Sequence, residues 1–187
     1  MPPLSPAQIA CLIVVTIGAV CDLRTKKIPN LLTFPAAALG IVLQLIQSGP
    51  PGALSAVEGW FAALGIMLLT RFLGWKSCPF GGGDLKLIAA VGSLLGPGDV
   101  LLVLWWFFLS FAFVNWWRLA SALPWRQFIR ALPALVSTGS LTCLAGIDWT
   151  TFNQARKAGQ LFGPFYAVGT YCAIFFRHAT RVFFGFN

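Results

Sequence analysis

The stretch CPFGGGDLKLIAAVG, from Cys78 to Gly92, places three glycines and an aspartate directly before a long apolar run. Its aspartate, Asp84, is one of only five acidic residues among 187. An Asp before a helix is commonly an N-cap, and a glycine run is often only a turn. An ionisable group beside a membrane interior, however, is often functional. The nature of the apolar run therefore decides how Asp84 is interpreted.

The composition of the chain is that of a membrane protein. Hydrophobic residues make up 58% of it, charged residues make up 10%, and the mean hydropathy is +0.80. Soluble domains are roughly a quarter charged. Because lipid offers the backbone no hydrogen-bond partners, membrane spans of this kind should be helices of about 20 residues. We predict an all-α, polytopic membrane protein.

Six apolar segments are expected to cross the membrane. They are Ala7–Val20, Leu31–Ile46, Leu54–Leu73, Leu85–Leu95, Val100–Ala120 and Leu161–Phe176. A further apolar segment, Ala131–Ile147, is broken by a proline and several small polar residues. It favours an interfacial or re-entrant segment over a seventh span. No linker is long enough to divide the chain, so residues 1–187 are expected to form one integral membrane domain.

The positive charges predict the orientation, because Lys and Arg concentrate on the cytoplasmic side of a membrane. With six spans and the N-terminus outside, eleven of the thirteen lie inside, and only Arg177 and Arg181 lie outside. If Ala131–Ile147 also crossed the membrane, Arg177 and Arg181 would lie inside, and Arg156 and Lys157 would lie outside. The number of positive charges inside would stay the same, so the charges do not distinguish six spans from seven. The net charge of +8 is divided among loops, which indicates anionic lipid as a partner and excludes nucleic acid.

The five cysteines show no C-x-x-C pair. This spacing argues against a zinc module or a disulfide framework, and small core residues are the better interpretation. We expect neither a metal nor a cofactor.

A second aspartate, Asp22, is expected at the same membrane edge as Asp84. It opens the stretch DLRTKKIPN, Asp22–Asn30, after the first span, and the connections after the first and third spans must share a face. Alone, Asp22 would be interpreted as a solvated loop charge, and Pro29 with Asn30 as a helix start. Two carboxyls that converge in a partly dry site share a proton. One can then activate water while the other protonates a scissile carbonyl.

Two stretches resemble the two signatures of the type IV prepilin peptidases, membrane aspartic proteases of the GxGD class. They are DLRTKKIPN and FGGGDLKLIAAVG, and FGPFYAVG at Phe162–Gly169 is similar to the last helix of that family. The resemblance implies that Asp22 and Asp84 are the catalytic pair. It also implies positioning or substrate-contacting roles for the other residues of the two signatures. These are Arg24, Pro29 and Asn30 in the first, and Gly81, Gly83 and Lys86 in the second.

The resemblance further implies a substrate, a location and a subtype. The substrates of the family are prepilins and pseudopilins, whose short basic leaders are removed at the cytoplasmic edge of the prokaryotic inner membrane. Larger members also methylate the new N-terminus and have an additional N-terminal domain with paired C-x-x-C motifs. The sequence shows none of those paired cysteines, so we expect no such domain and a resemblance to the small Flp or Tad type. We expect peptidase activity without methyltransferase activity.

Two other functions stay open. A channel, transporter or assembly subunit would use the membrane acids to bind protons or cations. A presenilin-like or signal peptide peptidase-like protease is a more distant alternative, because the tripeptide at Pro133–Leu135 matches a motif of that branch. A chance tripeptide is common in a chain this rich in Ala, Leu and Pro.

Overall fold

A computed structural model of the protein describes residues 3–73, 81–127, 129–130, 133, 150–157, 162–177 and 180. Within these ranges the chain is helical and contains no strand. The helices are α1 (Pro6–Thr25), α2 (Asn30–Leu73), α3 (Gly82–Leu95), α4 (Pro97–Ala122), α6 (Thr150–Lys157) and α7 (Gly163–Phe175). Three of them, α1, α2 and α4, are long and apolar enough to cross a membrane. The all-α prediction is confirmed.

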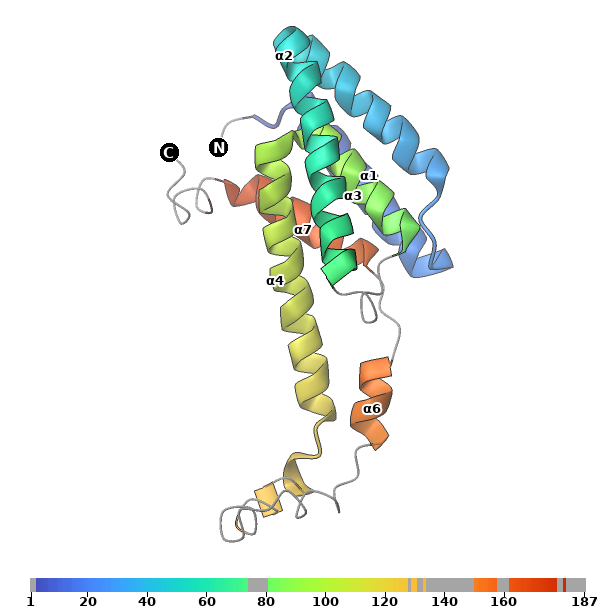
Figure 1. Ribbon diagram of the computed structural model, residues 1–187, viewed down its shortest axis with the longest axis vertical. Helices are drawn as coiled ribbons and strands as arrows, with labels where there is room; N and C mark the ends of the chain where they lie inside the picture. The colour runs from blue at the N-terminus through green and yellow to red at the C-terminus, as the bar shows by residue number, and fades with distance from the viewer. Residues whose placement is uncertain are drawn as a thin grey trace. The chain divides into compact units, whose positions relative to one another are not determined.

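Two of the predicted spans are the two arms of one helix, α2. Gly49, at φ 67°, takes a backbone conformation that favours glycine and interrupts the helical geometry. Pro50 and Pro51 follow, and a proline has no backbone N–H to continue the ladder. Figure 1 shows the resulting sharp bend between the arms. The chain therefore turns back within α2 at the predicted connection between the second and third spans.

Two other predicted spans correspond to short helices. Helix α3 has 14 residues and α7 has 13, which is less than the length of an untilted crossing. The segment Ala131–Ile147 lies outside the described residues except for one position. The number of spans therefore stays a prediction.

The internal contacts of the chain form two compact units. One contains Met1–Ser110 and Gln160–Asn187, and the other contains Phe111–Gly159. The first unit holds α1, α2, α3, α7 and the first half of α4, together with both expected aspartates. The second holds the end of α4 and the eight-residue helix α6. A single peptidase domain over the whole chain stays an expectation.

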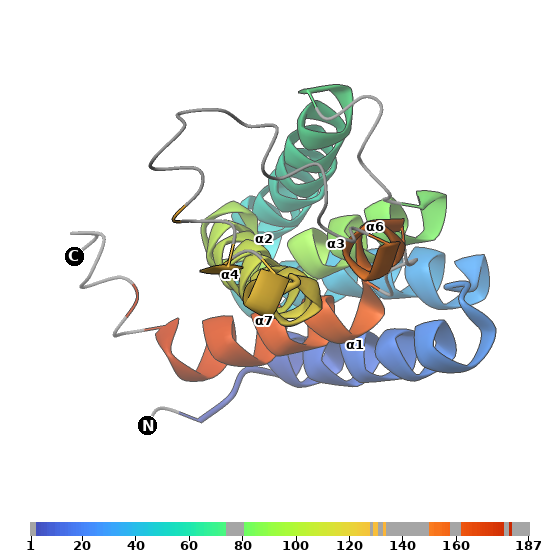
Figure 2. The ribbon, with the colours of Figure 1, turned by 90° about the horizontal axis from the view of Figure 1, so that it is seen from below.

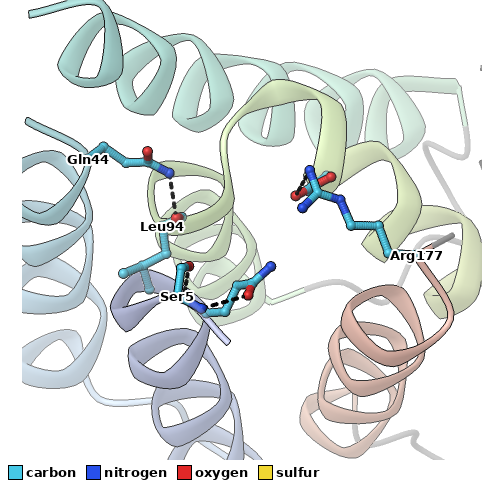
Figure 3. A network of polar contacts seen from close by, with 6 residues as sticks. Ser5, Gln44, Leu94 and Arg177 are labelled. Carbon is cyan, nitrogen blue, oxygen red and sulfur yellow. Dashed lines mark hydrogen bonds and ion pairs between the residues drawn. The ribbon is translucent and has the colours of Figure 1, made fainter. Parts of the chain in front are cut away.

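Helix α3 is buried between the two arms of α2. Every residue from Leu87 to Leu95 is buried. Gly40 on the first arm meets Ser93, and a Cβ added to Gly59 on the second arm would overlap the carbonyl oxygen of Gly92. Small residues allow helix backbones to approach this closely. The side-chain amide of Gln44 also donates to the carbonyl of Leu94 at 2.9 Å (Figure 3). The position of α3, and so of Asp84, is fixed from both sides.

Helices α1 and α7 pack against each other in opposite directions (Figure 2). Thr16 Oγ1 and the hydroxyl of Tyr171 form a hydrogen bond of 3.0 Å, while the C-terminal end of α1 meets Gly163 at the start of α7. Helix α1 begins with a capping box, in which Ser5 and Gln8 exchange hydrogen bonds between side chain and backbone (Figure 3). Because the two helices run in opposite directions, the start of α7 lies at the end of α1.

The opposite end of this unit contains an ion pair. Arg177 Nη2, just after α7, lies 3.1 Å from Asp99 Oδ2 in the first turn of α4 (Figure 3). The end of α7 therefore lies beside the turn between α3 and α4, as six alternating spans require. Asp84 lies at the other end of α3, about 16 Å from Leu95 along the helix axis.

Candidate active site

Asp22 lies on a helix and not in a loop, because helix α1 extends beyond the predicted span Ala7–Val20. Helix α1 continues to Thr25, and Lys26 closes it in the left-handed conformation, with its N–H donating to the carbonyl of Asp22 at 2.9 Å. Asp22 is only 6% exposed. A charged residue is rarely buried unless it has partners. The interpretation of Asp22 as a solvated charge is therefore wrong.

The carboxylate of Asp22 accepts a buried hydrogen bond from helix α7. The N–H of Gly163 donates to Asp22 Oδ2 at 2.7 Å. Gly163 is the first residue of α7, where amides have no partner within the helix and the helix dipole favours a negative charge. A Cβ added to Gly163 would lie 2.7 Å from the Cβ of Asp22, closer than such atoms pack. Glycine is therefore the residue that allows this contact.

Asp84 is the third residue of α3 and caps its own helix. The N-cap of α3 is Gly81, and the N–H of Gly81 donates to Asp84 Oδ2 at 2.9 Å, so Asp84 caps the helix from its third position and not as the expected N-cap. Asp84 is 8% exposed and precedes the predicted span Leu85–Leu95. The pKa of Asp84 is raised from 3.8 to about 6. Burial is the largest cause, the Gly81 hydrogen bond opposes the rise, and the negative charge of Asp22 adds to it. The two carboxyls are therefore close enough to interact electrostatically.

The three glycines before Asp84 have different surroundings. A Cβ on Gly83 would lie 3.2 Å from the Cβ of Ile28 and 3.4 Å from its carbonyl oxygen. A Cβ on Gly81 would lie 3.3 Å from Asp84 Oδ2, and one on Gly82 would meet nothing within 4 Å. Gly83 therefore allows the start of α3 to pack against the connection between α1 and α2, whereas Gly82 faces open space.

Lys86 and Asn30 join the two sequence signatures. Lys86 Nζ donates to Asn30 Oδ1 at 2.9 Å and lies 5.3 Å from the centre of the Phe34 ring. Asn30 is the first residue of α2, so the bond connects the starts of α2 and α3. Arg24 and Pro29 have exposed side chains on either side of the same connection. The structure thus brings all of the predicted site residues to one end of the helices.

Gly163 is a member of the site that the sequence motifs did not predict. FGPF was assigned only to the last helix, although a Gly followed by Pro is a helix-start signal. Its expected place on the same face as both aspartates was the available clue. Within the described ranges, no group of three His, Cys, Asp or Glu residues is placed to hold a metal ion. The arrangement is a pair of buried carboxyls, each with a backbone donor, that can share a proton.

Comparisons with known proteins identify related sequences. The sequence profile of the type IV leader peptidase family matches residues 9–117, which include both carboxyls and the Lys86–Asn30 pair. The chain is 32% identical over 123 residues to a prepilin leader peptidase/N-methyltransferase of Vibrio cholerae, covering 63% of this chain and 47% of the relative. It is 28% identical over 155 residues to the protein of that name from Dickeya chrysanthemi, covering 80% and 43%.

A third relative, from Escherichia coli K12, has the same name and is 34% identical over 89 residues, which cover 46% of this chain and 39% of that protein. The chain therefore spans less than half the length of the curated relatives it matches. No solved structure matches it significantly.

Proposed function

This chain belongs to the type IV leader peptidase family, and we propose that it is a membrane aspartic endopeptidase that removes the leader from prepilins or pseudopilins. One observation carries the proposal. Asp22 and Asp84, which lie in separate signatures, are both buried and interact electrostatically at one end of the helices. A pair of carboxyls that shares one proton has the composition that aspartic peptidases need.

The proposed reaction is hydrolysis by water. One carboxylate removes a proton from water, whose oxygen bonds to the scissile carbonyl carbon, while the other carboxyl donates its proton to the carbonyl oxygen. Collapse of this intermediate breaks the C–N bond, and a proton passes to the leaving amine. Lys86 and Asn30 position the two signatures against each other, and Gly83 allows Asp84 to approach. Arg24, Pro29 and Gly81 border the site and are proposed to contact the substrate leader.

We place the site at the cytoplasmic edge of the prokaryotic inner membrane. Asp22 lies in the last turn of α1 and Asp84 in the first turn of α3, so both lie at helix ends, as an interfacial site requires. With six spans, eleven of the thirteen Lys and Arg residues are expected on the same side of the membrane as the two aspartates. A substrate helix would remain in lipid while its basic leader remains in water. A Flp-type pseudopilin is the proposed substrate, and membrane lipid is the second partner.

The decisive experiment uses the purified protein and a panel of prepilins. Leader removal would be followed by mass spectrometry for the wild type, Asp22→Asn and Asp84→Asn. Asp99→Asn is the matched control, because its carboxylate lies at the other end of the unit and pairs with Arg177. We expect loss of cleavage in the first two variants and cleavage by the control. A folded Asp22→Asn or Asp84→Asn protein that cleaves at the wild-type rate would contradict the two-carboxylate mechanism.

The same assay separates the alternative functions. Absence of cleavage by every form, with proton or cation flux in vesicles, would support a channel or transporter. Cleavage of single-span peptides that lack a prepilin leader would support a presenilin-like activity. The mass of the product also tests for methylation, the second activity that the names of the relatives contain. We propose the peptidase reaction alone, because hydrolysis is the chemistry that the carboxyl pair supports.

A further inference from the structure

We propose that the start of α7 is a third component of the site, in which the backbone N–H of Gly163 positions the Asp22 carboxylate as the base of the pair. This inference rests on the proposed peptidase function and adds a proton assignment to it. Asp22 is then the base that activates water, and Asp84 is the acid that protonates the carbonyl. Gly163 is a positioning residue, since it acts through Asp22.

The position of Asp22 on its own helix explains why it needs this donor. Asp22 lies in the last turn of α1, where the negative end of the helix dipole disfavours a carboxylate. The Gly163 N–H supplies a hydrogen bond of 2.7 Å from the positive end of another helix. Short bonds to an ionised acceptor are among the stronger hydrogen bonds in proteins. Asp22 is therefore stabilised as an anion by α7.

Asp84 has the opposite balance. Its donor, Gly81, belongs to the same helix start, and burial still outweighs this bond and raises the pKa of Asp84 to about 6. The charge of Asp22 is one of the contributions to this raised pKa, as expected for two neighbouring carboxyls. Asp84 is therefore the carboxyl that burial favours as the acid of the pair.

Among the described contacts, the Asp22 carboxylate is held by the backbone N–H of Gly163 and not by an ionisable side chain. The ionisable side chains at the Asp22 end of the packed elements are Cys21, Arg24, Lys26 and Lys27 from α1 and the turn after it, Asp84 and Lys86 from α3, and Tyr166 from α7. Arg24, Lys26 and Lys27 are exposed, and Lys86 donates to Asn30. The α2 sequence contains no ionisable residue before Glu58. The described partner of the Asp22 carboxylate is thus a backbone amide.

The first test removes only the Gly163 N–H. Cell-free synthesis with a suppressor tRNA that carries glycolic acid replaces this amide by an ester and adds no side-chain atom. The same ester at Gly169, inside α7, is the control, because it removes a donor from the same helix far from Asp22. The measurement is the pH dependence of kcat/KM for leader cleavage, whose acid limb reports the ionisation of the base.

We expect the acid limb to move up by about one to two pH units with the ester at 163, the shift that corresponds to a lost hydrogen bond to a charged group. The ester at 169 should leave the limb unchanged. An unchanged limb with the ester at 163, or an equal shift with the ester at 169, would overturn the inference. A wild-type protein that cleaves no prepilin would instead contradict the proposed function, so the two failures are distinguishable.

A second test does not depend on cleavage. The chain contains four aspartates, so ¹³Cγ-labelled Asp gives four carboxyl signals that Asn substitutions assign. Gly163→Ala introduces a Cβ that would lie 2.7 Å from the Cβ of Asp22, while Gly169→Ala introduces one 2.9 Å from the carbonyl oxygen of Val103. Both changes disturb the packing of α7, but only the first disturbs Asp22. We expect the chemical shift of the Asp22 carboxyl to change in Gly163→Ala alone, and equal changes in the two variants would overturn the inference.

Discussion

Adding one methyl group at two adjacent glycines should have opposite consequences. At Gly83 the new Cβ would lie 3.2 Å from the Cβ of Ile28, 3.4 Å from its carbonyl oxygen and 3.5 Å from its nitrogen. Ile28 is buried and connects α1 to α2, so a movement of a few tenths of an ångström must involve that connection or the start of α3. At Gly82 the Cβ would meet no atom within 4 Å.

The magnitudes follow from these contacts. Replacing a helical Gly by Ala stabilises by up to about 1 kcal/mol in open space, so Gly82→Ala should be neutral or more stable. Overpacking costs about 1–3 kcal/mol, which should cancel or exceed that gain in Gly83→Ala. Asp84 follows Gly83 directly, and a misplacement of about 1 Å at a catalytic group can cost about 100-fold in rate. A shift of Asp84 by a few tenths of an ångström should therefore reduce kcat/KM by roughly 3- to 10-fold.

The assay combines thermal unfolding in detergent with kcat/KM for leader cleavage. We expect Gly82→Ala to keep wild-type activity within about twofold and Gly83→Ala to lose activity, with a lower melting temperature than Gly82→Ala. Equal behaviour of the two alanine variants would refute the packing argument. Loss of activity in Gly82→Ala alone would mean that the open space at Gly82 belongs to the substrate.

Three further predictions concern other parts of the first unit. Because the folded pKa of Asp84, about 6, lies above its ordinary 3.8, its contribution to stability is complete below pH 3.8 and is lost as the pH rises through 6. The melting temperature of the wild type minus that of Asp84→Asn should therefore fall between about pH 4 and pH 7, and a constant difference would contradict the burial argument. Lys86→Met and Asn30→Ala should be non-additive in stability by about 0.5–1 kcal/mol, whereas additive effects would show that their bond contributes nothing. A reporter fused after Asn187 should report the outer side, and a cytoplasmic signal would make Ala131–Ile147 a true span.

Much of the candidate site followed from the sequence because alternating spans constrain which ends meet. Asp22 and Asp84 were expected at one membrane edge, and the structure brings both to one end of the helices, where Asn30 and Lys86 also lie. The all-α architecture followed from composition, because an α-helix satisfies its own backbone hydrogen bonds in lipid, whereas a sheet with an open edge does not. Short-range signals also located the bend of α2, where Gly49 precedes two prolines.

The remaining features depend on packing, which sequence patterns do not describe. Helix α1 extends beyond the predicted span, because hydropathy marks the edge of the hydrocarbon and not the end of a helix. The burial of Asp22 arises from contact with α7, 141 residues later in the chain. The different roles of Gly82 and Gly83 depend on the place of Ile28, and three identical letters cannot distinguish them.

The hydrogen bond between Gly163 and Asp22 has a consequence for the order of synthesis. A ribosome completes Asp22 first, Asp84 next and Gly163 only after 141 residues have followed Asp22. A nascent chain that has both aspartates in the membrane but has not yet inserted α7 lacks the amide that receives the Asp22 carboxylate. The carboxyl pair is therefore fully assembled only after α7, the last described helix of the chain, has inserted into the bilayer.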